Sequence, residues 1–189
     1  LPILLVTSLS FGIRAGTLND FGSLFQLDKT QLAAITATAF YGFPIAVVLG
    51  GFVVDIIGMK RLLVLAFLFH LAGILLTVFA TGYWTLYIST LLIGIANGTV
   101  EAACNPLVTA LYSDNKTTKL NHFHLWFPGG IGRGSLLVFG INALHLNWDL
   151  KSILQFKIGL MLVPTVIYGY LFSKLNFPVT EIVASGVST

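Results

Sequence analysis

The sequence predicts an all-α integral membrane protein, a bundle of six transmembrane helices. The 189 residues are 56% apolar and only 9% charged, and the mean hydropathy is +0.91. The apolar residues form long blocks of about 20 residues, the length that a helix needs to cross a bilayer. A membrane barrel would instead show segments of about ten residues with alternating polarity. Because helices satisfy their own backbone hydrogen bonds in lipid, a helical bundle is the expected fold.

Six apolar blocks follow one another along the chain, and we expect each of them to form one span. The polar breaks between them are short, so consecutive helices should be antiparallel neighbours. We expect a single six-helix domain over 1–175 and the start of a cytoplasmic linker to a missing second half at 176–189. The expected spans are 1–25, 31–57, 61–80, 83–112, 121–145 and 153–173.

The charges in the breaks predict the orientation. The second break, the fourth break and the tail after the sixth span hold Lys60, Arg61, Lys116, Lys119 and Lys174, whereas the lysines of the other breaks stand close to an Asp. The positive-inside rule therefore places these five cations and the N-terminus in the cytoplasm. We expect the cell (inner or plasma) membrane as the location and membrane lipid as a partner. Nucleic acid is not an expected partner, since the cations form no basic face.

A motif occupies the break between the second and third spans: Gly51-Phe52-Val53-Val54-Asp55-Ile56-Ile57-Gly58-Met59-Lys60-Arg61. It resembles the signature between the second and third helices of the major facilitator superfamily. There, a glycine permits close contact, and an Asp with basic residues forms a charge lock that breaks as the transporter changes state. The resemblance implies gating roles for Gly51, Asp55, Gly58, Lys60 and Arg61. Ile56 stands where that superfamily usually has Arg.

Two further stretches resemble the fucose:proton symporter family within this superfamily. They are Thr17-Leu18-Asn19-Asp20 in the first span and Glu101-Ala102-Ala103-Cys104-Asn105-Pro106-Leu107 in the fourth. The resemblance covers essentially the whole chain and implies the N-terminal six-helix half of such a transporter, built of two three-helix inverted repeats, with a C-terminal half as its partner. It also implies proton coupling through Asp20 and Glu101.

The chemistry of the spans agrees with that implication. Carboxylates inside a span usually face a bundle interior or a wet cavity, and they are functional candidates by default. The first and fourth spans lead the two repeats, and transporter sites lie at repeat interfaces. Asn97, Glu101 and Asn105 are spaced at i, i+4 and i+8, so they share one helix face and offer donors and acceptors to sugar hydroxyls. Helix–helix hydrogen bonding is the alternative role for the asparagines, Asn19 included.

Two arginines near mid-span complicate the interpretation. Arg14 or Arg133 would keep Glu101 ionised if it paired with that carboxylate. Either could instead bind an anionic sugar acid through its planar guanidinium, or form a structural ion pair. Trp126 is a candidate for stacking on a sugar ring.

The remaining candidates are weaker. His122 and His124 have no third ligand nearby, so no metal site is predicted, and packing or hydrogen bonding is favoured. His70 has no local partner and is interpreted as structural. Lys157 is expected to extend to the outer interface beside Asp149. The sequence carries no P-loop, dinucleotide-binding or protease motif, so we expect neither an enzyme nor a cofactor.

The leading hypothesis is a secondary active transporter that moves a monosaccharide by alternating access, as sugar:proton symport. The alternatives are a sodium-coupled carrier, since carboxylate and amide oxygens also hold hard cations, a facilitative sugar carrier, a carrier of an anionic sugar acid, and a membrane sensor that binds substrate without transporting it.

Overall fold

The computed structural model describes residues 2–185, and all regular secondary structure within them is helical. The fold class predicted from the sequence is therefore correct in its all-helical character. Eight α-helices and one 3-10 turn follow each other in the order α1 (Pro2–Phe25), α2 (Lys29–Ile57), α3 (Met59–Val78), α4 (Tyr83–Leu111), η1 (Ser113–Asn115), α5 (Lys116–Ala143), α6 (Leu150–Gly159), α7 (Leu162–Lys174) and α8 (Glu181–Ala184).

Two of the expected spans differ from the observed helices. Helix α5 begins at Lys116, five residues before the expected start, because the 3-10 turn leads directly into it. The sixth expected span consists of α6 and α7, which a turn at Leu160 and Met161 joins. Both turn residues keep right-handed helical dihedrals, so 150–174 crosses the bundle as one rod of 25 residues.

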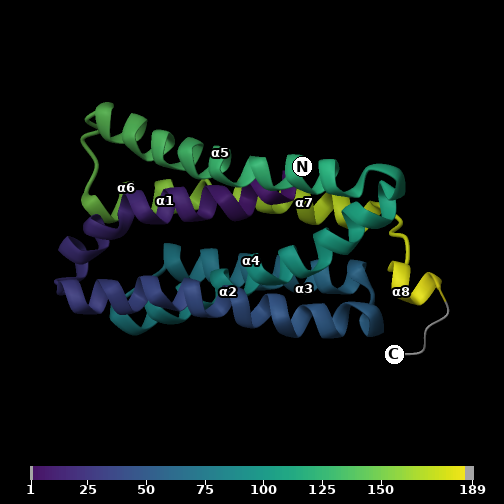
Figure 1. The fold of residues 1–189 in the computed structure, drawn as a ribbon. Helices are drawn as coiled ribbons and strands as arrows, with labels where there is room; N and C mark the ends of the chain where they lie inside the picture. Colours follow the sequence, from purple (N-terminus) through teal and green to yellow (C-terminus); the bar gives the residue numbers. More distant parts are fainter. Residues whose placement is uncertain (1, 186–189) are drawn as a thin grey trace.

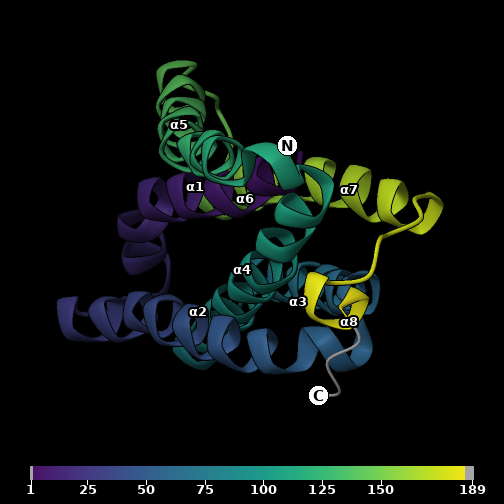
Figure 2. The ribbon, with the colours of Figure 1, turned by 45° about the vertical axis from the view of Figure 1, so that its right-hand side comes forward.

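The helices form two layers. Helix α1 packs mainly on α5 and also contacts α6 and α7, while α4 packs on α2 and α3. Figure 1 shows α5, α1 and α7 on one side and α2, α3 and α4 on the other, and Figure 2 shows the end of α4 crossing toward α5. The α2–α3 turn, the α4–α5 connection and the end of α7 gather at one end, on the right of Figure 1, here called the Lys60 end.

Four helical segments of the described chain are long and apolar enough to cross a membrane: α2, α3, α4 and the α6–α7 rod. Helices α1 and α5 contain 24 and 28 residues, which also suffices for a span. They carry more polar side chains, among them Arg14 and Asp20 in α1 and Arg133 in α5. The structure therefore supports an integral membrane protein.

Local chemistry sets the boundaries of α2. Asp28 caps its start by accepting a hydrogen bond from the Gln31 amide at 2.8 Å, and the Gln31 side chain accepts one from the Asp28 amide at 3.0 Å. This reciprocal pair satisfies two backbone donors that a helix start leaves open. At the other end Gly58 has a φ of +83°, a conformation that glycine adopts without steric cost. The chain can thus reverse into α3 within one residue.

The buried core consists of two apolar clusters with a polar layer between them. One cluster lies at the Lys60 end and includes Leu63 and Val100, and the other lies at the opposite end and includes Ile74 and Ile93. Between them along α1, α3 and α4 stand buried polar side chains, among them Ser10, His70 and Asn97. The middle of the bundle therefore contains groups that can hydrogen-bond from one helix to another.

Candidate functional site

Glu101 lies on α4 and meets α5. Its Oε1 accepts a hydrogen bond from Asn105 Nδ2 at 3.2 Å and lies 3.4 Å from His124 Nδ1. The Glu101 side chain is 16% exposed and that of His124 is 48% exposed, so the imidazole connects a largely buried carboxylate with the surface. Among the described residues, Asn105 Oδ1 is a buried acceptor that receives no hydrogen bond. The site thus combines a carboxylate, a titratable imidazole and an open amide oxygen.

Neither arginine forms a salt bridge with Glu101 among the described contacts, so the condition under which one of them would keep this carboxylate charged is not met. Arg14 donates from Nη1 to Thr77 Oγ1 at 2.9 Å and from Nη2 to Thr90 Oγ1. These bonds hold its guanidinium between α1, α3 and α4, beside a cavity of about 210 Å³. Arg133 is exposed on α5, and its guanidinium carbon lies 5.3 Å from the Trp126 ring centroid.

Asn97 belongs to a buried chain of hydrogen bonds rather than to the Glu101 site. Its Oδ1 is 2.8 Å from His70 Nε2, and its Nδ2 donates to Ser10 Oγ at 3.3 Å. The other nitrogen of His70, Nδ1, is 2.8 Å from the Tyr168 hydroxyl. Since an amide oxygen only accepts, Nε2 carries the proton, and a neutral Nδ1 accepts from the tyrosine. This series of hydrogen bonds joins α7, α3, α4 and α1. Of the two roles expected for Asn97, the structure thus shows hydrogen bonding between helices.

Asp20 forms a salt bridge with Lys157, whose Nζ lies 2.9 Å from Asp20 Oδ2. The lysine is fully buried at 1% exposure, while the Asp20 side chain is 31% exposed. The prediction that Lys157 extends to the outer interface beside Asp149 is therefore wrong. A buried ammonium needs a charged partner, and the contact between α1 and α6 supplies one, whereas Asp149 caps α6 and hydrogen-bonds Ser152.

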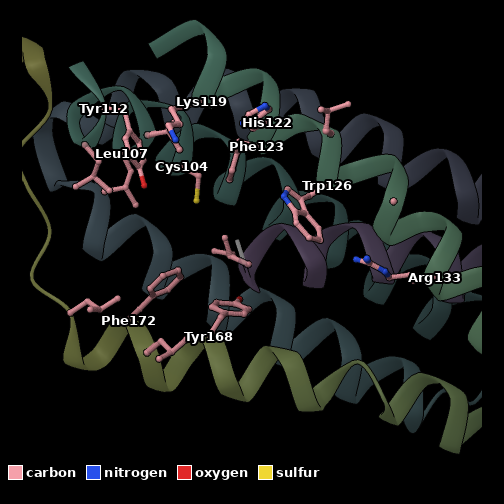
Figure 3. Close-up of a pocket in the computed structure, with 17 residues that line it drawn as sticks. Cys104, Leu107, Tyr112, Lys119, His122, Phe123, Trp126, Arg133, Tyr168 and Phe172 are labelled. Atoms are coloured by element: carbon pink, nitrogen blue, oxygen red, sulfur yellow. The ribbon is translucent and has the colours of Figure 1, made fainter. Parts of the chain in front are cut away.

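Trp126 and Arg133 line a different space from Glu101. They lie in a groove of about 800 Å³ between α5 and α7, together with Tyr168 on its opposite wall, and Figure 3 shows them facing across it. His124 and Trp126 are two positions apart on α5, which places them about 200° apart around the helix. The remaining substrate candidate, Asn19, is exposed on α1 and has no hydrogen-bond partner among the described side chains.

The predicted gating residues contact the segment that follows α7. Lys60 Nζ donates to the Leu175 carbonyl at 3.0 Å, and the buried Thr180 hydroxyl donates to Asp55 Oδ1. Gly51 lies on the exposed face of α2, and an added Cβ there would meet no atom within 4 Å. The two other members of the motif are Gly58, which makes the turn, and the exposed Arg61.

Sequence reasoning favoured packing or hydrogen bonding for His124 but did not pair it with Glu101, although a signal for that pair exists. Glu101 stands ten residues before the end of α4 and His124 eight residues after the start of α5. In antiparallel neighbours those positions lie at a similar depth. The partners of His70 and Lys157, in contrast, come from helices far apart in the chain, and no local pattern indicates them.

The chain is similar to several curated proteins of known family. It is 27% identical over 167 residues to a TsgA homolog of Buchnera aphidicola, covering 87% of the chain and 41% of that protein. It is 24% identical to facilitated glucose transporter member 10 of Xenopus laevis, covering 92% and 32% respectively. It is 28% identical to a D-xylose-proton symporter-like protein of Arabidopsis thaliana, covering 67% and 25%. The chain thus spans less than half of the length of these relatives.

The model of one protein family, described as Major Facilitator Superfamily, matches residues 1–174. That range contains every long helix of the bundle and the Glu101, Asp20 and Asp55 sites. The match confirms the family resemblance that the sequence motifs indicated, and with it a transporter rather than an enzyme. The chain belongs to the Major Facilitator Superfamily.

Proposed function

We propose that this chain is the N-terminal half of a secondary active transporter that carries a monosaccharide by alternating access, coupled to protons. The observation that carries the proposal is the contact of Glu101 with His124 and Asn105 at the surface between α4 and α5. Relatives named as a facilitated glucose transporter and a xylose-proton symporter-like protein support a sugar as substrate. The second half, absent from this chain, would complete the substrate cavity.

The proposal includes six spans arranged as two inverted repeats, and the packing of the helices supports it. In such repeats α1 corresponds to α4 and α2 corresponds to α5. The contact of α1 with α5 therefore corresponds to the contact of α4 with α2. Exchanging α3 with the α6–α7 rod likewise turns the α4–α3 contact into the contact of α1 with that rod. Each of these contacts is present. The two leading helices, α1 and α4, carry Asp20 and Glu101, as expected for sites at a repeat interface.

Glu101 and His124 would then act as one proton-binding unit. The carboxylate and the imidazole lie 3.4 Å apart, close enough for one proton to be held between them. Asn105 fixes the carboxylate through the same oxygen, Oε1. When the imidazole is exposed on one side of the membrane it can exchange protons with water, and the pair retains one proton while the cavity closes.

The experiment uses the full-length protein in liposomes. We expect sugar uptake to follow an imposed pH gradient. Glu101→Gln should retain equilibrium counterflow but lose accumulation against a gradient, and His124→Gln should shift the pH dependence of uptake. His145→Asn serves as a matched control, because His145 is exposed in the α5–α6 connection with a φ of 45°, which Asn tolerates.

Accumulation that persists in Glu101→Gln would remove Glu101 from the coupling role. Uptake that follows a sodium gradient at constant pH would select sodium as the coupling ion. A saturable sugar affinity without flux would identify a sensor instead of a transporter.

A facilitative carrier is the second candidate, and one contact favours it. Asp20, the other predicted coupling carboxylate, forms an ion pair with the buried Lys157 at 2.9 Å, so only Glu101 of the two predicted coupling residues is left for that role. Sugar flux that equilibrates at the same rate with and without a pH gradient would support this candidate and refute symport.

A further inference from the structure

The groove between α5 and α7 is separate from the Glu101 site and has a distinct composition. Its walls are apolar, with Leu107, Leu111, Leu125, Leu171 and Phe172 among the lining residues. The buried Phe123 and Tyr168 also line it, and the hydrogen bond from Tyr168 to His70 holds that ring in place. A volume of about 800 Å³ falls within the range of about 300–1,000 Å³ that ligand pockets occupy.

The charged residues of the groove, Lys119 and Arg133, are both basic, and an imidazole, His122, lies beside them. Lys119, His122 and Arg133 lie on one face of α5 together with Trp126, and none of the 17 lining residues is acidic. Figure 3 shows Lys119 and His122 at the end next to Tyr112, with Trp126 in the middle and Arg133 beyond it. Lys119 is exposed at the Lys60 end, where α5 starts and the bundle meets the membrane surface.

The groove is long enough to cover the hydrocarbon of one membrane leaflet. Lys119 and Arg133 are 14 positions apart, which is about 21 Å along a helix. Half of the bilayer's hydrocarbon thickness is about 15 Å, so an acyl chain that starts at Lys119 ends inside the groove. The Trp126 ring, 40% exposed, lies along that path.

We propose that this groove binds a membrane phospholipid with an anionic headgroup, its phosphate at Lys119 and His122 and one acyl chain along Trp126 and Leu171. Basic pockets between transmembrane helices bind such headgroups, and the apolar walls suit an acyl chain but offer few partners to sugar hydroxyls. The chain's own described tail is not the occupant: Phe177 packs on Phe172 but is not among the lining residues, and Thr180 further on hydrogen-bonds Asp55 of α2.

The test measures lipid retention by native mass spectrometry of the full-length protein. Phosphatidylglycerol and phosphatidylcholine with identical acyl chains are the two probes. We expect phosphatidylglycerol to be retained more strongly, and Lys119→Gln to lower its affinity about five-fold, which corresponds to the ~1 kcal/mol of one basic residue near a lipid surface. Lys174→Gln is the matched control, since Lys174 lies at the same end but outside the groove.

A second pair of variants tests the groove without changing charge. Gly129 lines the groove, and a Cβ added there meets no atom within 4 Å, so Gly129→Phe should fill the groove while the protein still folds. Gly132 is equally open but lies outside the groove, and Gly132→Phe controls for the added ring. We expect Gly129→Phe to abolish retention and Gly132→Phe to preserve it, with matching thermal stability.

Three results would overturn the proposal. The first is equal retention of both phospholipids. The second is retention of phosphatidylglycerol that Gly129→Phe leaves unchanged. The third is a protein segment of the second half crosslinked to position 129, which would show that the groove is a protein interface. None of these results bears on the coupling role of Glu101, because Glu101, Asn105 and His124 are not among the residues that line the groove.

Discussion

The salt bridge between Asp20 and Lys157 allows a test of whether Asp20 acts in coupling or in stability. Lys157 is fully buried, and its ammonium lies 2.9 Å from the carboxylate. Asp20→Asn would leave that ammonium without its counterion. Breaking a buried pair by removing one partner costs about 3–5 kcal/mol. Because the Asp20 side chain is 31% exposed, we expect the lower end, about 3 kcal/mol.

The reverse substitution should cost less. Lys157→Met replaces the buried ammonium with an apolar chain of similar length and leaves a carboxylate that water can reach, so we expect a loss of about 1–2 kcal/mol. The double variant Asp20→Asn with Lys157→Met contains neither charge and should recover most of the loss, since replacing both members of a buried pair is often neutral.

Thermal unfolding of the full-length protein in detergent measures all three variants, with transport assayed in parallel. A change of 1 kcal/mol shifts the midpoint by about 2–4 °C in a protein of 150–250 residues, so the order of the three shifts matters more than their size. Equal losses for the two single variants, or a double variant as unstable as Asp20→Asn, would refute this reasoning. If Asp20→Asn were as stable as the wild-type protein but no longer accumulated sugar, Asp20 would have a role in coupling instead.

Three further predictions concern the packing and the loops. Asn97→Leu removes the partner of two buried polar groups and should lower the free energy of unfolding by about 1–3 kcal/mol, as denaturant titration measures. Gly98→Leu should prevent α4 from approaching α2, because a Cβ there meets the carbonyl oxygen of Phe43, whereas Gly132→Leu meets open space; folded yield in detergent distinguishes them. Hydrogen bonds from Ser152 lower the pKa of Asp149 in the folded protein. The Asp149 cap therefore stabilises α6 fully at a pH above the pKa of Asp149 in the unfolded chain, and this stabilisation is lost as the pH falls through the lower pKa of the folded state. Hydrogen exchange of the α6 amides should then become faster, and Asp149→Asn should remove this pH dependence.

The sequence predicted the helices well because each span is a local property. The apolar blocks placed both ends of α2, α3 and α4 within two residues of the observed boundaries, since hydropathy and cap residues such as Asp28 act over a few positions. The starts of α5 and α6 were less accurate, because a polar first turn outside the lipid carries no hydrophobic signal. The sequence also identified the family, from motifs in contiguous residues.

The partners of the charged and polar side chains could not be predicted in the same way. Glu101 shares a helix face with Asn105, and the i, i+4 spacing alone indicates that contact. Which cation or imidazole meets Glu101 depends on the rotation of α5 about its axis, and a step of two residues separates His124 from Trp126 by more than half a turn. Sequence reasoning therefore grouped Trp126 with the substrate site, while the structure places it in the groove.

The sequence by itself determined that this protein is an all-helical member of a transporter superfamily with carboxylates inside its spans, because span length, hydropathy and short motifs are encoded in neighbouring residues. Only the tertiary structure decided that Glu101 meets His124, that Asp20 meets Lys157, and that Asn97 belongs to a chain from Tyr168 to Ser10. Those contacts join helices up to 137 positions apart in the chain, and they depend on how each helix is rotated and crossed against its neighbours, which no local pattern specifies.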